Sequence, residues 1–317
     1  MEAIGGYFSL ELPLYEEYHK NAIRLNTGRN CLEYILRTRK FSKVYIPYYT
    51  CEVVLEPFQK LNISYAFYHI NQHFELSENV SIEEGEALLY TNYYGLKQRY
   101  VEELSEKYGN QLIVDNTQAF FAKPIGGIDT FYTCRKFLGV PDGAYLYTDA
   151  QFDDDLEQDV SYERMAHLLK RIDLSAEEGF ADFRKADDSL DNQPICKMSK
   201  LTERMMRSID YTAVKERRRE NFRLLHEALE SSNQMSVELD GEAVPMVYPY
   251  MTDKAGLREH LIKNKVFVAK YWPNVLEWTE KKDAEYDMAN LMLAIPVDQR
   301  YSGTAMNKII EIISRYG

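Results

Sequence analysis

Long apolar runs are absent from this 317-residue sequence. No segment approaches the roughly 18 consecutive apolar residues that indicate a membrane-spanning helix. The opening segment, MEAIGGYFSLELPLYEEYHK, also lacks the basic end and apolar stretch of a secretory signal. We therefore expect a cytoplasmic protein that does not bind membranes.

Cysteine is scarce, and the cysteines form no CxxC pair. Closely spaced Cys and His ligands are the usual signature of a zinc site. His69, His73 and His167 do not supply that spacing either. The sequence therefore predicts no metal site and four reduced thiols, which are Cys31, Cys51, Cys134 and Cys196.

Basic residues are in the minority, with 38 Lys and Arg against 50 Asp and Glu and a formal net charge of -12. Binding to nucleic acid needs a basic surface, so nucleic acid is not an expected partner. A small anionic substrate remains possible, because one local site can be positive on an acidic protein.

Strand and helix patterns alternate from residue 25 to about residue 150, which predicts an α/β fold with a mainly parallel sheet between helices. In such sheets, ligands bind beyond the carboxyl ends of the strands. Asp115 ends one expected strand and Lys136 follows another, so both become site candidates. We expect strands at 43–47, 63–70, 87–92, 111–115, 130–134 and 143–148, and helices at 51–61 and 99–108.

The second half of the chain is less regular. Residues 181–197 have the composition of a long loop, and 198–232 predict one long helix with a kink near Tyr211. Strand patterns at 244–251, 266–272 and 291–297 alternate with helix patterns at 257–263 and 306–316. We therefore expect a large domain over 1–200 and, over 201–317, a connecting helix and a small α+β domain. Tyr271 and Trp272 either line a cleft of this domain or pack in its core.

Gly28 stands at the start of an expected helix in LNTGRNCLEYIL, with Asn26 or Thr27 as its cap. Backbone N–H groups at a helix N-terminus bind phosphate, and glycine lets a ligand come close. An ordinary capped helix after a turn explains the same pattern.

Asp115 and Gln118 occur together at the end of an apolar strand in VDNTQAF. A buried carboxylate needs a cationic partner, and a protonated pyridine nitrogen is one such partner. The alternative is a structural acid that caps the next segment. Lys136 could form an imine after losing its proton, or it could be an ordinary surface lysine.

The order and wording of these segments resemble the DegT/DnrJ/StrS sugar aminotransferases, which belong to the fold-type-I pyridoxal-phosphate enzymes. VDNTQAF (114–120) is similar to the family's acid-x-x-Gln-Ala strand end. PIGGIDTFYTCRKFLGVPDGAYLYTD (124–149) is similar to the segment with the Schiff-base lysine. RRRENFRLLHEAL (217–229) and LAIPVDQRY (293–301) extend the resemblance toward the end of the chain.

The resemblance implies a role for each site candidate. Lys136 would carry pyridoxal 5'-phosphate as a Schiff base and act as the general acid and base. Asp115 would pair with the pyridine nitrogen, Gln118 would contact the ring oxygen, and Gly28 and Arg29 would supply phosphate-binding amides.

Three positions depart from the family pattern. Thr133 or Thr130 stands near the family's phosphate-binding serine, with Phe131 at the ungapped position. Cys51 replaces the aromatic residue that stacks on the ring, so Tyr49, Tyr48 or Tyr94 would take over. Lys197 stands where the family has an arginine that reaches a neighbouring subunit.

The implied activity is transfer of an amino group from glutamate to a nucleotide-linked keto sugar, for surface polysaccharide or a related product. A homodimer with the site at its interface is implied as well. Two alternatives are a pyridoxal-phosphate sugar dehydratase or lyase, in which the lysine is usually replaced, and a non-catalytic member acting as a binding protein.

Overall fold

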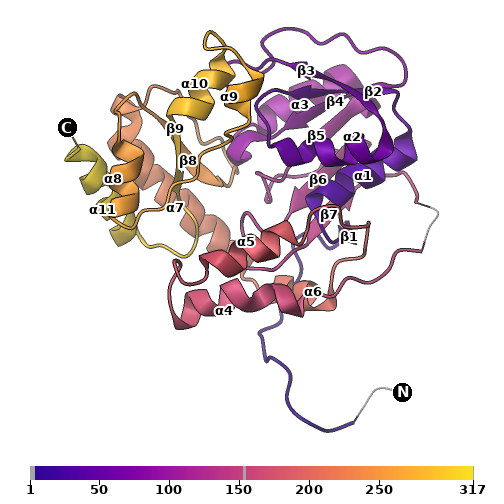
Figure 1. The fold of residues 1–317 in the computed structure, drawn as a ribbon, viewed down its shortest axis with the longest axis horizontal. Helices are drawn as coiled ribbons and strands as arrows, with labels where there is room; N and C mark the ends of the chain where they lie inside the picture. Colours follow the sequence, from indigo (N-terminus) through magenta and orange to yellow (C-terminus); the bar gives the residue numbers. More distant parts are fainter. Residues whose placement is uncertain (1–3, 153–154, 317) are drawn as a thin grey trace.

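A seven-stranded sheet forms the centre of the computed structural model, which describes residues 4–152 and 155–316 (Figure 1). The strand order is β1-β7-β6-β5-β4-β2-β3. Only β7 runs antiparallel to its neighbours, so the predicted mainly parallel sheet is confirmed. The strands are β1 (Ile23–Leu25), β2 (Lys43–Pro47), β3 (Ser64–Tyr68), β4 (Glu86–Thr91), β5 (Leu112–Asp115), β6 (Asp129–Thr133) and β7 (Ala144–Tyr147).

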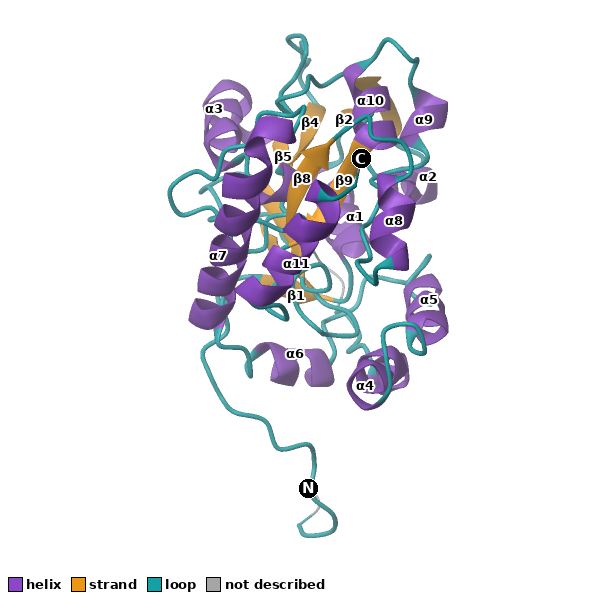
Figure 2. Ribbon diagram, turned by 90° about the vertical axis from the view of Figure 1, so that its left-hand side faces the viewer, coloured by secondary structure: helices purple, strands orange, loops and turns teal. Residues whose placement is uncertain are grey.

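Helices cover both faces of this sheet. Alternate residues of a strand point to opposite faces, so neighbouring residues of one strand pack in different layers. On β4, Ala87 and Leu89 pack with α1 (Gly28–Arg39) and α2 (Glu56–Leu61). Leu88 and Tyr90 pack on the other side, with α3 (Gln98–Tyr108) and residues of α7 (Tyr211–Leu229). Figure 2 shows β4 and β5 between these two pairs of helices. The result is a three-layer domain whose strand ends meet at one edge.

Helix α1 begins at a side-chain cap. Thr27 accepts a hydrogen bond from the backbone N–H of Asn30 through its Oγ1, at 3.1 Å. Thr27, one of the two predicted candidates, is therefore the cap. Asn26 instead donates from Nδ2 to the Pro194 carbonyl at 3.0 Å, which ties the start of α1 to the segment before Met198. The helix start is thus fixed from two sides.

The C-terminal part contains a two-stranded antiparallel sheet of β8 (Val247–Met251) and β9 (Met292–Pro296). Figure 1 shows α7, α8 and α11 next to this sheet. A large domain over 1–200 and a small one over 201–317 stay a prediction. The remaining helices here are α8 (Leu257–Lys263), α9 (Val275–Trp278), α10 (Ala284–Leu291) and α11 (Gly303–Ser314).

Residues 181–197 were expected to be a loop, and this is wrong for their first half. Helix α5 (Phe180–Asp188) follows α4 (Ala166–Asp173) as a hairpin, and α5 buries Ala186 while Phe180 and Phe183 stay exposed. With little apolar surface buried, the sequence pattern of this helix is weak.

The single long helix expected over 198–232 is two helices, α6 (Lys200–Met206) and α7. Asp210 starts α7 by accepting a hydrogen bond from the Ala213 N–H at 3.0 Å, which favours a new helix over continuation of α6. The expected strand at 266–272 is also wrong, since it pairs with β9 only at Ala269. The segment then turns so that Trp272 packs against Tyr49.

The strands and helices expected before residue 150 are confirmed, with shifts of a few residues at their ends. One exception is the start of the 51–61 helix, which is a 3-10 turn (Glu52–Leu55). Among residues 4–152 and 155–316, no helix combines the length and the apolar character needed to cross a membrane.

His19 is buried among aromatic side chains, and its protonation is expected to make the free energy of unfolding depend on pH. Its Nε2 lies 2.7 Å from the Phe120 carbonyl, its Nδ1 lies 3.1 Å from the Tyr147 hydroxyl, and Tyr132 is its nearest ring. Burial lowers the pKa of His19 to about 4, against the opposing effect of the Phe120 carbonyl. The folded chain therefore holds a neutral imidazole where the unfolded chain takes up a proton below about pH 6.5.

We expect the free energy of unfolding to be highest above pH 6.5 and to fall as the pH drops toward 4. The loss from His19 should reach roughly 3 kcal/mol. Urea unfolding at several pH values checks this, with His19→Phe as the variant that lacks the titrating group. An equal pH slope in the variant would contradict the assignment.

Candidate active site

The predicted site residues lie where β5, β6 and the start of α1 meet. Asp115 is the last residue of β5, Thr133 the last of β6, and Gly28 the first of α1. A Cβ on Gly28 would lie 3.3 Å from Thr117 Cγ2 and 4.0 Å from Thr133 Cβ. The structure therefore brings together residues that lie more than 100 positions apart in the chain.

Lys136 projects from the turn that follows β6, and its side chain is exposed. Its Nζ donates a hydrogen bond to Thr117 Oγ1 at 3.0 Å. The turn is closed by the N–H groups of Phe137 and Leu138, which both donate to the Cys134 carbonyl, at 3.2 and 3.0 Å. The amine is thus held near the end of β5 while remaining accessible to a ligand.

Asp115 is 7 % exposed, and its hydrogen bonds come from neutral donors. The Thr117 N–H donates to Oδ1 at 2.8 Å, and Thr91 Oγ1 lies 3.5 Å from Oδ2. Burial raises the pKa of Asp115, while the nearby charge of Lys136 and the bonds from Thr117 oppose that shift. A buried carboxylate held in this way suits a further cationic partner, such as a protonated ring nitrogen.

Gln118 is 1 % exposed, and its side chain binds the backbone of a neighbouring segment. Its Oε1 accepts a hydrogen bond from the Tyr94 backbone N–H at 2.9 Å. Tyr94 has a φ of 55°, a left-handed conformation that is unusual for a tyrosine, and this bond helps to hold it. The contact of Gln118 with a cofactor ring oxygen stays a prediction.

Tyr49 lies inside the core, with no exposed surface. Its hydroxyl lies 3.1 Å from the Tyr94 hydroxyl, and its ring is 5.1 Å from that of Trp272. Burial raises the pKa of Tyr49 far above its usual range. Tyr94 and Trp272 therefore occupy part of the space around the Tyr49 ring. The stacking of Tyr49 on a cofactor stays a prediction.

Arg29 and Arg135 both use their side chains for ion pairs beside the site. Arg29 Nη1 lies 2.7 Å from Glu56 Oε2 and 2.6 Å from Asp191 Oδ1, and Arg135 Nη1 lies 2.8 Å from Asp187 Oδ1. These pairs fasten α5 and the residues after it next to α1 and Lys136. For Arg29, the predicted phosphate contact would come from its backbone N–H.

Of the two threonines predicted to contact the phosphate, Thr133 at the end of β6 is the one that lies beside the start of α1. Thr133 is half-buried, and its Oγ1 is 3.5 Å from the Gly143 carbonyl. Thr130 is buried and donates to the Ile128 carbonyl at 3.2 Å, nearer the other end of β6. Phe131 lies in the core below Gly28, 3.9 Å from a Cβ at that position.

Two residues that sequence reasoning did not assign also lie at the site, Cys51 and Tyr271. Burial raises the pKa of the Cys51 thiol, and the charges of Lys136 and Arg29 partly oppose this shift. Burial raises the pKa of Tyr271 to about 12, with a further contribution from Cys51. Asn274 anchors the Tyr271 segment by donating to the Thr50 carbonyl at 3.0 Å.

Tyr271 thus brings an aromatic ring from the C-terminal part next to Tyr94, with the two ring centres 5.9 Å apart. The sequence pattern pointed to Tyr271 and Trp272 as a pair, and it did not decide whether they line a cleft or pack in the core. Trp272 is the core residue of the two, at 8 % exposure, and Tyr271 is only partly buried.

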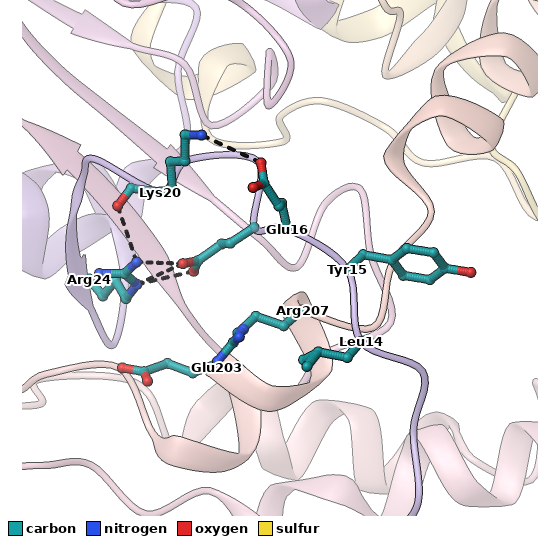
Figure 3. Close-up of a pocket in the computed structure, with 8 residues that line it drawn as sticks. Leu14, Tyr15, Glu16, Lys20, Arg24, Glu203 and Arg207 are labelled. Carbon is teal, nitrogen blue, oxygen red and sulfur yellow. Dashed lines mark hydrogen bonds and ion pairs between the residues drawn. The ribbon is translucent and has the colours of Figure 1, made fainter.

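A different hollow lies between residues 14–24 and α6, with a cavity of about 510 Å³ (Figure 3). Its charged groups largely pair with one another, since Arg24 binds Glu17 and Lys20 binds Glu16. None of the predicted site residues lines it. This hollow is therefore separate from the strand-end site.

A methyl group at Gly28 would come close to Thr117, with its carbon 3.3 Å from Thr117 Cγ2. We expect Gly28→Ala to weaken binding of a phosphate-containing cofactor by about tenfold, because the new methyl group displaces Thr117 or narrows the phosphate position. Stability should stay the same or rise slightly, because alanine favours helix. Titration with pyridoxal phosphate and thermal unfolding measure the two effects. Unchanged affinity would show that the phosphate lies elsewhere.

Comparisons with solved structures concern the fold. An aminotransferase from Brucella abortus, named after DegT, DnrJ, EryC1 and StrS, superposes with a TM-score of 0.62 at 16 % identity over 93 % of this chain and 86 % of its own. The chain has the fold of the sugar aminotransferases.

Two further structures support this fold. DesV from S. venezuelae, solved with a ketimine intermediate, matches with a TM-score of 0.63 at 15 % identity, over 92 % of this chain and 83 % of its own. The dehydratase ColD, solved with GDP-perosamine, matches with a TM-score of 0.63 at 12 % identity, over 92 % of this chain and 88 % of its own. By sequence, no family model and no curated protein matches. The predicted fold-type-I architecture is confirmed.

Proposed function

We propose that this protein is a pyridoxal-phosphate-dependent aminotransferase of the DegT/DnrJ/StrS family. The observation that carries the proposal is the placement of an accessible lysine amine beside a buried aspartate at the carboxyl edge of the sheet. Thr117 connects the two, since its hydroxyl accepts from Lys136 and its N–H donates to Asp115.

The residues present fit the cofactor. Asp115 would pair with the ring nitrogen, and the N-terminus of α1 at Gly28 and Arg29 would bind the phosphate, together with Thr133. When bound, pyridoxal phosphate would supply an electron sink for chemistry at the α-carbon of an amino acid. Cys51 and Tyr271 would lie near the bound cofactor.

Lys136 would have two tasks. Its Nζ would hold the cofactor covalently before the reaction. Once displaced by the amino donor, the same Nζ would take the proton from the donor's α-carbon and return it at the end. Thr117 would orient the amine for both tasks through the hydrogen bond at 3.0 Å.

The proposed acceptor is a nucleotide-linked keto sugar, and the proposed donor is glutamate. Support for the acceptor comes from solved structures with the same fold, among them DesI with its TDP-sugar product and ColD with GDP-perosamine. A role in surface polysaccharide biosynthesis or a related pathway follows from the resemblance alone.

The test uses the purified protein with pyridoxal phosphate. A visible absorption band should form and should disappear on addition of glutamate, with 2-oxoglutarate as the product. The second candidate is a sugar dehydratase, since the dehydratase ColD has the same fold. It would be favoured if the band stays unchanged with amino donors and the protein catalyses loss of water from a keto sugar. A protein that takes up no cofactor would favour a non-catalytic binding protein and overturn the proposal.

A homodimer and a cytoplasmic location belong to the same proposal. Large apolar side chains stay exposed on α4 and α5, namely Leu169, Ile172, Phe180 and Phe183. Exposed apolar surface of this kind is typical of an interface. Sedimentation at several concentrations would measure the mass of the assembly.

A further inference from the structure

Three segments that are distant in the sequence meet at one buried cation, Arg218 of α7. We propose that Arg218 is a positioning residue that fixes the turn carrying Lys136 against the C-terminal part of the chain. Its effect on catalysis rests on the proposed function, whereas its effect on the turn does not.

Arg218 is 1 % exposed, so its charge and its donors are removed from water. Burial lowers the pKa of Arg218 to about 10, and the nearby Asp298 opposes this shift. A buried guanidinium is unfavourable unless its N–H groups are satisfied. Here the hydrogen-bond acceptors are one amide side chain and three backbone carbonyls, of Gln299, Phe137, Pro245 and Met246.

Phe137 directly follows Lys136 in the chain, and its carbonyl accepts two hydrogen bonds. Arg218 Nη2 donates to it at 3.0 Å, and Gln299 Nε2 donates to it at 2.8 Å. The guanidinium also lies 4.5 Å from the centre of the Phe137 ring, a cation–π contact. The turn after β6 therefore has anchors from α7 and from the segment after β9.

Arg218 also links this turn to the opposite side of the site. Its Nη1 donates to the Met246 carbonyl at 3.1 Å, and the Met246 N–H donates to the Tyr94 carbonyl at 2.8 Å. Gln118 holds the Tyr94 N–H. One continuous set of hydrogen bonds thus runs from the Lys136 turn to Gln118, and a change at Arg218 should disturb both ends.

The first test removes one of the two hydrogen bonds to the Phe137 carbonyl and leaves Arg218 in place. Gln299→Glu keeps an acceptor for Arg218 Nε but removes the donor to the Phe137 carbonyl. We expect amide hydrogen exchange of Phe137 and Leu138 to become about five- to tenfold faster in the cofactor-free protein. Amides in β4 should exchange as in the wild type, and the thermal midpoint should change little.

Arg218→Lys is the second variant, because lysine keeps the charge and loses the planar fork of donors. It should accelerate the same two amides and also those of Tyr94 and Met246. Arg217→Lys is the matched control, since Arg217 is the neighbouring residue, is paired with Glu220 and is 42 % exposed at its side chain. The control should leave all four amides unchanged.

The inference is overturned if Arg218→Lys leaves the amides of Phe137 and Leu138 at wild-type exchange rates, whatever the result for Gln299→Glu, because Arg218 still donates to the Phe137 carbonyl in that variant. It is equally overturned if exchange rises uniformly along the chain, which would be a general loss of stability. With pyridoxal phosphate bound, both variants should also shift the pH midpoint of the visible band. If no cofactor binds to any form, the proposed function fails while the exchange result still decides the role of Arg218.

Discussion

Lys136→Ala is expected to abolish covalent attachment of pyridoxal phosphate and to lower aminotransferase turnover by about 10³-fold or more. The loss follows from the structure, because Lys136 is the amine next to Asp115 and is held by Thr117 at 3.0 Å. No shift of the visible band on glutamate addition should remain. Absorption spectra and initial rates with glutamate measure both effects.

The fold itself should tolerate this change. The Lys136 side chain is exposed and makes one hydrogen bond, so the free energy of unfolding should change by only about 0.5 kcal/mol. Lys185→Ala is the matched control, because Lys185 is an exposed lysine on α5. A glutamate-sensitive band in the Lys136 variant, or its loss in the Lys185 variant, would show that another lysine carries the cofactor.

Asp115→Asn is expected to separate function from stability. An asparagine cannot pair with a protonated ring nitrogen as an anion, and losing one partner of a buried ion pair costs about 3–5 kcal/mol. Cofactor affinity and turnover should therefore fall together, by at least about 100-fold. Equilibrium titration with pyridoxal phosphate and steady-state kinetics give the two numbers.

The cofactor-free variant should be as stable as the wild type or more stable. Burial raises the pKa of Asp115, so the folded state holds its proton more tightly than the unfolded state does. This contribution to the free energy of unfolding is present at low pH and is lost as the pH rises above 3.8 through the raised pKa. The stability gain of Asp115→Asn should therefore appear above that range and vanish in acid.

A contrary result is clear-cut. If Asp115→Asn destabilises the cofactor-free protein strongly and leaves cofactor affinity intact, then Asp115 is a structural cap for the Thr117 segment. The bond from the Thr117 N–H at 2.8 Å would be its main task in that case.

The central sheet could be predicted from the sequence because its strands are short apolar segments that are buried on both faces. The placement of Asp115 and Lys136 at the same edge of the sheet followed from the rule that parallel strands end at one edge. Helix α5 escaped prediction because it buries only a narrow side, and its charged residues hide the pattern.

The contacts around Lys136 could not be predicted in the same way. Thr117 and Lys136 are 19 residues apart, and Phe137 and Arg218 are 81 residues apart, so neither pair belongs to one local motif. Tyr271 reaches the site only because its segment leaves β9 after one residue pair and docks on Thr50. Such placements depend on tertiary packing, which no period of apolar residues encodes.

The most direct measurement is chemical mapping of the cofactor. The purified protein is saturated with pyridoxal phosphate, reduced with borohydride so that the bond to lysine becomes permanent, digested and analysed by mass spectrometry. The account predicts one modified peptide, with the added pyridoxyl group on Lys136. Modification of a different lysine, or of none, would contradict it.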